Sequence, residues 1–286
     1  MVAILGGLAA AMSWAIATLA SSRSSRMIGP MSVLGWVMAI GLVVAIGPAL
    51  LAKPVPLGTG EVAMLVVTGI SHNLGLLLAY AALSIGRVSL VAPITSTEGA
   101  LAALIAVLLG EVLGLATALL LTVIATGVVL AAVERAADRP GALDPATTRK
   151  AAILAVCAAV TFSVGLVLGG RLGEAGVPPA WVMAVSRTIG TVVIALPLLL
   201  TGRLRLTRRA LPLVAVAGLL EVVGGAVYVV AATEDIAVAA VLSSQFAAIA
   251  AIGAFLVFRE RLQRVQVAGI ATIAIGMTLL SALSAA

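Results

Sequence analysis

The sequence is poor in the residues with which a soluble protein covers its surface. Only 10% of the 286 residues are charged, 3% are aromatic, and there is one cysteine and one histidine. A soluble domain needs polar residues on its outside, so a chain that is 63% hydrophobic is interpreted as a polytopic membrane protein. The single cysteine, Cys157, excludes an intrachain disulfide.

The sequence also lacks the motifs of several classes of enzyme and binding protein. There is no GxxxxGK loop to cradle phosphates, so ATP is not expected to drive the protein directly. One histidine without a cysteine cluster forms no zinc site, and no Ser-His-Asp set is identifiable. The net charge of +6 comes from arginines between hydrophobic runs, without interleaved aromatics. We therefore predict no enzyme activity, no metal, no cofactor and no nucleic-acid partner.

Long hydrophobic runs are what the sequence has in abundance. A membrane-spanning helix needs about 20 apolar residues, and ten runs fit. Because lipid offers the backbone no hydrogen-bond partners, and because the runs do not alternate strictly, they are expected to be helices. The predicted spans are Val2–Ala20, Met31–Leu51, Val62–Leu83, Ser89–Leu109, Val112–Val133, Ala151–Leu172, Pro178–Leu200, Leu211–Ala231, Ala237–Phe258 and Val265–Leu283.

One stretch of the chain resembles a later stretch of the same sequence. Residues 86–130 read GRVSLVAPITSTEGALAALIAVLLGEVLGLATALLLTVIATGVVL, and adding 149 to their numbers gives residues 235–279 with several identical positions. The same gap-free shift also holds before this stretch, which indicates an internal duplication. The matched pairs are Pro30/Pro179, Gly41/Gly190, Gly69/Gly218, Gly75/Gly224, Glu111/Glu260, Leu113/Leu262 and Gly127/Gly276.

The longest polar stretch, Glu134–Lys150, joins the fifth and sixth predicted spans. It divides the chain into a first repeat of residues 1–133, a linker of residues 134–150 and a second repeat of residues 151–286. Because five is an odd number, the second repeat has to enter the membrane from the opposite side. The expected fold is an all-α integral membrane protein with ten transmembrane helices in two inverted five-helix repeats, an architecture typical of transporters.

Positive charge is concentrated on one side of the predicted spans. Fourteen of the 17 Lys and Arg residues fall in loops on that side, against Lys53 and Arg171 on the other, and Arg187 lies inside the seventh span. Cytoplasmic loops carry an excess of positive charge, so this distribution places both termini outside the cytoplasm.

Four ionisable residues, His72, Glu98, Arg187 and Glu221, lie near the middle of predicted spans, where each needs a reason to be present. His72 and Glu221 are related by the shift of 149. Glu98 either exchanges a proton near neutral pH, the reading we favour, or only holds helices together. The same two readings apply to Glu221 and to His72. Arg187 keeps its charge, so it is either the partner of Glu98 or Glu221 or a clamp for a substrate carboxylate or phosphate.

Further polar and aromatic residues lie at a similar depth. Asn73 adjoins His72, and Gln245 in the ninth span overlies Ser96 in the fourth. With the four ionisable residues, Asn73 and Gln245 make up the predicted substrate and proton pathway. Pro93 frees a backbone carbonyl and is a hinge, a ligand site or a static kink. The candidates for a hinge or a cavity lining are Pro93, Ser96, Trp14, Tyr80 and Tyr228; packing or lipid contact is the alternative for the aromatics.

The stretch VSLVAPITSTEGALAALIAVLLGE resembles the EamA-type members of the drug/metabolite transporter superfamily. Those proteins carry small and polar residues and then a proline early in the fourth helix, a Gly-Glu pair at its end, and spaced glycines in the fifth helix. The corresponding residues here are Ser89, Pro93, Gly110, Glu111 and Gly127. The second copy has Leu242 and Arg259 in place of the proline and the glycine, and keeps Glu260. Glu111 and Glu260, at helix ends, are expected to be structural.

The resemblance extends over the full length and implies a multi-pass protein of a prokaryotic plasma or inner membrane. It implies a secondary transporter that exports small organic metabolites such as amino acids by alternating access around a midplane cavity. Proton coupling through Glu98, Glu221 or His72 is a hypothesis that follows from their depth. Family members are commonly drawn with cytoplasmic termini, which is the opposite of the orientation that the charges predict.

The sequence also fits other functions. An uncoupled facilitator would have the same fold, with Glu98 locked to Arg187. An exporter of cations would suit Glu98 and Glu221, although Arg187 would repel the substrate. A membrane scaffold would be expected to have an apolar midplane, and an enzyme acting on lipid would need a nucleophile or a metal cluster. The expected partners are a small-molecule substrate and the lipid bilayer, and glycine-bearing faces on the fifth and tenth spans also allow a homodimer.

Overall fold

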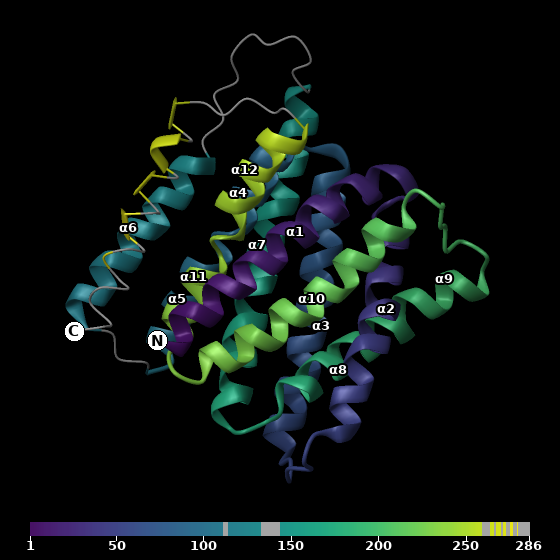
Figure 1. Ribbon diagram of the computed structural model, residues 1–286, viewed down its shortest axis with the longest axis horizontal. Helices are drawn as coiled ribbons and strands as arrows, with labels where there is room; N and C mark the ends of the chain where they lie inside the picture. The colour runs from purple at the N-terminus through teal and green to yellow at the C-terminus, as the bar shows by residue number, and fades with distance from the viewer. Residues whose placement is uncertain are drawn as a thin grey trace.

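The computed structural model describes residues 1–110, 114–132 and 144–258, and ten scattered residues between 264 and 279. Every regular element in these ranges is a helix (Figure 1). The elements are α1 (Val2–Ile28), α2 (Pro30–Leu51), α3 (Thr59–Ile85), α4 (Val88–Thr95), α5 (Glu98–Leu108), α6 (Leu115–Ala132), α7 (Pro145–Glu174), α8 (Pro179–Gly190), a π-helical turn (Thr191–Ala195), α9 (Leu196–Leu200), α10 (Leu211–Ala232), α11 (Ile236–Ser243) and α12 (Phe246–Phe258).

Seven helical stretches in the described ranges are long and apolar enough to cross a membrane. Each of the first nine predicted spans contains helix, but α6 and the pair α11 and α12 include only shorter apolar segments. Most of the tenth predicted span, Val265–Leu283, and most of the linker Glu134–Lys150 lie outside the described residues. The same is true of Glu111, Arg259 and Glu260.

The fourth and ninth predicted spans are each interrupted near their middle, whereas each is predicted as one continuous helix. Residues 96–97 separate α4 from α5, and residues 244–245 separate α11 from α12. The shift of 149 carries the first interruption to within one residue of the second. Both halves of the chain therefore have a discontinuous helix at the equivalent place, which creates a helix terminus inside the bundle.

At both interruptions a serine hydroxyl bonds to a carbonyl of the preceding turn. The hydroxyl of Ser96 donates to the carbonyl of Pro93 at 2.9 Å, and the hydroxyl of Ser244 donates to the carbonyl of Val241 at 2.7 Å. Such bonds offer the carbonyls an alternative to the N–H groups of the helix and tend to bend it. Since the second copy has Leu242 in place of the proline, a proline is not required for the interruption.

The seventh predicted span contains a different irregularity. The π-helical turn Thr191–Ala195 lies between α8 and α9, and Pro197 follows it. Proline has no N–H to donate and its ring conflicts with the carbonyl four residues earlier, which disfavours a regular α-helix there. The turn begins four residues after Arg187, on the same continuous stretch of helix, and π turns often occur at functional sites.

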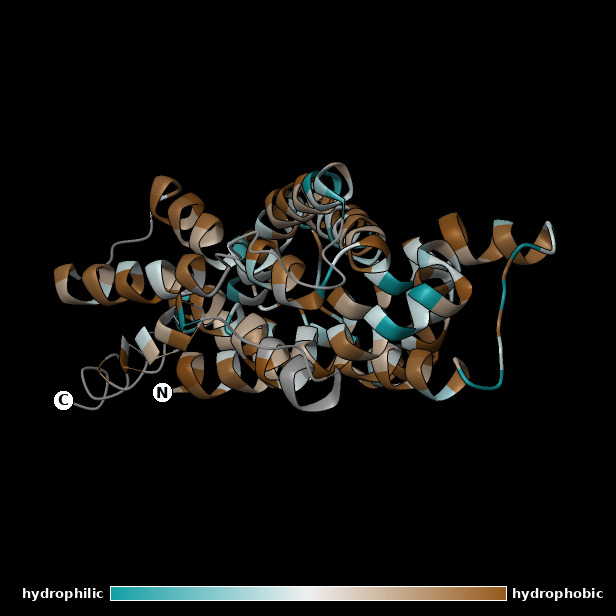
Figure 2. Ribbon diagram, turned by 90° about the horizontal axis from the view of Figure 1, so that it is seen from above, coloured by the Kyte–Doolittle hydropathy of each residue, from teal (hydrophilic) through white to brown (hydrophobic). Residues whose placement is uncertain are grey.

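The outside of the bundle is apolar. Val43, Leu50, Leu51 and Leu200 are 76%, 81%, 87% and 77% exposed. In Figure 2 the hydrophobic colouring covers the outer helices, and hydrophilic colouring is strongest in a connecting loop and in parts of the interior. So much exposed apolar surface suits contact with lipid chains rather than with water.

The two halves of the chain pack on each other in a matched way. α1 lies along α10 (Figure 1), and α3 lies along α7 in the corresponding arrangement. A Cβ atom added at Gly69 would lie 2.7 Å from Ile189, and one added at Gly218 would lie 3.0 Å from Ile40. Gly218 is 149 residues after Gly69, and Ile189 is 149 residues after Ile40. Close helix contacts in one half therefore recur in the other.

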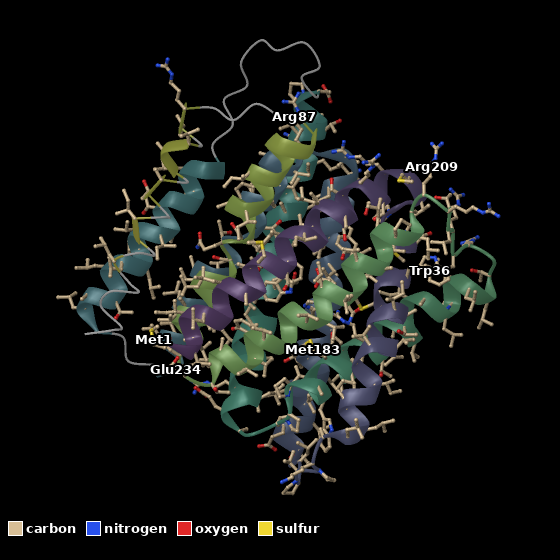
Figure 3. All side chains as sticks on the ribbon, in the orientation of Figure 1. Met1, Trp36, Arg87, Met183, Arg209 and Glu234 are labelled. Atoms are coloured by element: carbon tan, nitrogen blue, oxygen red, sulfur yellow. The ribbon has the colours of Figure 1, made fainter. Side chains whose placement is uncertain are left out.

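The two ends of the bundle differ in charge. Arg87 and Arg209 lie at one end, which we call the basic end, and Met1 and Glu234 lie at the opposite end (Figure 3). Arg26 belongs to the basic end, where its guanidinium donates to two carbonyls at the end of α3 at 3.3 and 2.6 Å. Because α3 ends and α10 begins at the basic end, these two helices run in opposite directions.

Candidate functional site

A cavity of about 90 Å³ lies between the two halves of the chain, and α1, α3, α4, α5, α7, α8, α10 and α12 all contribute to its wall. On α3 the lining extends from Thr68 to Leu83, toward the basic end. On α10 it extends from Glu221 to Val229, toward the opposite end. The cavity thus follows much of the depth of the bundle and has room for several water molecules.

Equivalent positions of α3 and α10 line this cavity. Four pairs of lining residues are related by the shift of 149: His72/Glu221, Leu76/Gly225, Ala79/Tyr228 and Tyr80/Val229. Each half thus supplies the same helix face, with different side chains on it. Tyr80 lies toward the basic end and Tyr228 toward the opposite end, with the titratable pair between them.

Glu221, in the middle of α10, has two titratable neighbours. Its Oε2 atom lies 3.9 Å from Nη2 of Arg187 and 3.5 Å from Nε2 of His72. Arg187 is 0% exposed and does not line the cavity, and its Nη1 lies 3.5 Å from the sulfur of Met38. Arg187 is therefore a fixed positive charge behind the cavity wall, placed to compensate Glu221.

Glu98 is the second carboxylate of the cavity. It is 4% exposed, and its Oε2 atom has no hydrogen-bond partner among the described residues. No ion pair joins Glu98 to a basic side chain in the described part of the chain. Glu98 is the first residue of α5, where the helix dipole favours a negative charge. The interruption between α4 and α5 is what creates this helix terminus inside the bundle.

Other polar atoms gather at the same cavity. Trp14 Nε1, Thr68 Oγ1 and Ser186 Oγ are buried and lack a hydrogen-bond partner within the described ranges, and all three residues line the cavity. The rings of Trp14 and Tyr228 lie side by side, with centroids 6.0 Å apart. Buried polar groups are normally satisfied, so this concentration of unsatisfied atoms indicates a place for a polar ligand or for water.

The structure places some of the predicted site residues in the lining of the cavity and the others outside that lining. The predicted residues that line the cavity are His72, Glu98, Glu221, Trp14, Tyr80 and Tyr228. Those that do not line it are Arg187, Asn73, Gln245, Pro93 and Ser96. Asn73 donates from Nδ2 to two backbone carbonyls, of Gly69 at 2.7 Å and of Ser186 at 2.9 Å, and so joins α3 to α8. Gln245 donates to a carbonyl of α11 at 2.8 Å.

Several residues that line the cavity are not predicted from the sequence. Thr68 lies four residues before His72, so the helical period of α3 could have found it. Ser186 directly precedes Arg187, and the sequence marks only the charged residue of this pair as a candidate. Phe162, whose ring centroid is 5.8 Å from that of His72, and Phe246 are apolar residues in apolar runs, and nothing in the sequence marks them.

Comparison with known families identifies the fold. The profile of the EamA-like transporter family matches residues 1–133 and matches again over residues 149–282. The chain belongs to the EamA-like transporter family. This family is part of the drug/metabolite transporter superfamily, as the motif of the fourth span predicted. Together with its long apolar helices, membership makes this EamA-like chain a multi-pass membrane protein.

Other comparisons add the fold but no substrate. No curated protein matches the chain. One solved structure, described as the crystal structure of a protein, aligns with a TM-score of 0.74 over 98% of this chain and 96% of its own length. The two sequences are 20% identical, so the likeness concerns the fold alone. What this EamA-like protein carries has to be inferred from its own cavity.

Proposed function

We propose that this EamA-like protein is a secondary transporter that moves small organic metabolites through the central cavity by alternating access. Membership of a transporter family supports the class, and the cavity supports the route. Export of amino acids or related compounds from the cell is the direction and cargo that the family resemblance favours. The observation that carries the proposal is a polar, partly unsatisfied cavity to which both halves of the chain contribute equivalent positions.

Two inverted five-helix repeats, ten spans in all, are the architecture that we propose for this movement. In such an arrangement a residue beside the two-fold axis lies next to its own counterpart. His72 lies 3.5 Å from Glu221, and Met38 lies 3.5 Å from Arg187. Members of each pair are 149 residues apart. The opposite directions of α3 and α10 and the paired interruptions of the helices support the same architecture.

Rocking of one half against the other would expose the cavity to each side in turn. Polar groups at the end of an interrupted helix are a recurrent way to hold a solute near the middle of a membrane. Glu98 has this position in the first half. Its equivalent in the second half is Ala247, so the two halves are not chemically interchangeable and the specific function is expected to depend on the first.

Proton coupling through Glu98, Glu221 or His72 is part of the proposal. An uncoupled facilitator of the same fold is the second candidate. Two neighbours already constrain Glu221, whereas Glu98 has no basic partner among the described residues, so Glu98 is the group best placed to bind and release a proton.

Flux measurements in proteoliposomes separate the two candidates. We expect a pH gradient to drive accumulation of a transported solute by the wild-type protein, and Glu98→Gln to abolish this accumulation while exchange continues. Glu174→Gln is the control and should behave like the wild type, because Glu174 is a half-exposed carboxylate that pairs with Arg171 at 3.0 Å. If gradient-driven flux in Glu98→Gln is identical to that of the wild type, Glu98 is not the coupling group. If no solute moves through the wild type or any variant, the protein is not a transporter.

A further inference from the structure

The charges around the cavity do not cancel. Arg187 lies 3.9 Å from Glu221 and compensates it from behind the wall. Glu98 faces the same cavity, is 4% exposed, and has no basic partner in the described part of the chain. One carboxylate is therefore left uncompensated, and a buried carboxylate in a membrane protein needs a positive charge or a proton from elsewhere.

The lining offers little to hold an anion. Among the described residues that line the cavity there is no lysine and no arginine, and the only titratable base is His72. His72 is already within 3.5 Å of Glu221. A substrate carboxylate or phosphate would therefore meet two carboxylates and, within the described lining, no free cationic partner. A zwitterionic amino acid would have its ammonium group recognised and its carboxylate repelled.

The remaining wall suits a cation with an apolar body. Trp14, Tyr80, Tyr228, Phe162 and Phe246 bring aromatic rings to the cavity, and the faces of such rings attract ammonium groups as well as apolar surface. Ammonium groups have three N–H donors and no acceptor. The unpartnered oxygen of Glu98 and the lining hydroxyls of Thr68 and Ser186 are acceptors for them.

From this charge balance and this lining we infer that the cavity selects a small organic monocation, an ammonium group on an apolar or aromatic body, with Glu98 as its counter-ion. The inference rests on the proposed function, because it names the substrate class of the same cavity. It favours amines over the amino acids from which they differ by a carboxylate. Arg187 would repel a cation if it lined the cavity, but it lies behind the wall, where its charge is compensated by Glu221.

A matched set of four ligands tests the charge preference on the wild-type chain. 2-Phenylethylammonium, phenylalanine, 3-phenylpropionate and 2-phenylethanol share one aromatic body and differ in charge: positive, zwitterionic, negative and neutral. Binding to the purified full-length protein in detergent is measured by the shift of the unfolding temperature with ligand concentration. We expect the ammonium compound to bind at least about tenfold more tightly than the other three. Equal or tighter binding of the anion, the zwitterion or the alcohol overturns the inference.

The same ligands applied to two variants identify the counter-ion. Glu98→Gln keeps the volume and removes the charge, so it should lose the preference for the ammonium compound and bind 2-phenylethanol as before. Glu174→Gln, outside the cavity, should keep the wild-type preference. A preference that survives in Glu98→Gln overturns the role of Glu98. If Glu98→Gln does not fold, the ligand series on the wild-type protein still decides the charge preference.

Counterflow in proteoliposomes distinguishes failure of this inference from failure of the proposed function. If 2-phenylethylammonium binds in a Glu98-dependent way but none of the four compounds exchanges across the membrane, the cation site is supported and the proposed transport activity is contradicted. If phenylalanine or 3-phenylpropionate exchanges as well as 2-phenylethylammonium does, the transporter stands and the cation site does not.

Discussion

Arg187 and Glu221 offer the sharpest test of the charge balance on which the cavity depends. Arg187 Nη2 and Glu221 Oε2 are 3.9 Å apart, and the two residues are 0% and 5% exposed. At this separation two unit charges attract by about 4 kcal/mol at an effective dielectric constant of about 20. Desolvation offsets much of that gain, but removing one partner leaves a buried charge uncompensated, which typically costs about 3–5 kcal/mol.

The perturbation is a double-mutant cycle. We predict that Arg187→Gln and Glu221→Gln each lower the free energy of unfolding by about 3 kcal/mol or more. The double variant should lose at least ~2 kcal/mol less than the sum of the two single losses, because neither charge is left alone. Equilibrium unfolding in mixed micelles of a mild detergent and dodecyl sulfate measures all four proteins.

A second cycle supplies the control. Arg171 and Glu174 form an ion pair at 3.0 Å, but their side chains are 34% and 38% exposed. An exposed pair of this kind should show a coupling energy below about 1 kcal/mol. If the Arg187–Glu221 cycle gives no larger coupling than the exposed cycle, Arg187 does not compensate Glu221 and the uncompensated charge cannot be assigned to Glu98.

Three further predictions concern the packing and the ends of the bundle. A Cβ at Gly99 would lie 2.5 Å from a backbone carbonyl oxygen of α11, so Gly99→Ala should cost about 1–3 kcal/mol in the same unfolding assay. Gly47→Ala is the control and should cost nothing, because a Cβ at Gly47 would have nothing within 4 Å. Equal effects of the two substitutions would contradict the close packing at Gly99. Asn73→Leu removes the hydrogen bond to Ser186 that joins α3 to α8, together with the bond to Gly69 within α3, and should cost about 1–2 kcal/mol. A neutral effect would show that the bond to Ser186 does not hold the two helices together. At the opposite end, a backbone N–H at the start of α1 donates to Glu234 and lowers the pKa of its carboxyl below the usual 4.5. A carboxyl whose pKa is lowered by folding stabilises the fold when the pH is above its unfolded-state pKa, and this stabilisation is lost as the pH falls through the folded-state pKa. Below pH ~4.5 the unfolding temperature of Glu234→Gln should therefore decline less steeply with falling pH than that of the wild type. An unchanged slope would contradict the contact.

The sequence predicts the helices well because lipid imposes a simple rule. Long apolar runs without alternation have to be helices, and most of the predicted runs contain the helices described above. The interruptions of the fourth and ninth spans are not predicted, although Ser96 and Ser244 each lie in a short polar run, TSTE at residues 95–98 and SSQ at residues 243–245. Whether their hydroxyls bond to the preceding carbonyls depends on local geometry that the pattern of hydrophobic residues does not contain.

The depth of the site residues is predictable, but the direction in which they point is not. His72 and Asn73 are neighbours in sequence, yet His72 lines the cavity and Asn73 joins α3 to α8, because adjacent residues of a helix point about 100° apart. Likewise, the sequence left open whether Arg187 accompanies Glu98 or Glu221. The structure places it beside Glu221, because α8 packs against α10, and the sequence does not show which helices are in contact.

Alternating access through the cavity is the central claim, and a sequential labelling experiment tests it most directly. Leu83 and Val229 line the cavity toward the basic end and the opposite end, respectively. Each would be replaced by cysteine, singly and together, in a Cys157→Ala background in proteoliposomes. The account predicts that a bulky, membrane-impermeant thiol reagent reaches position 83 from one side only and position 229 from the other only. It also predicts that modification at one position slows modification at the other. Labelling of both positions from the same side, or at rates that do not depend on each other, would contradict it.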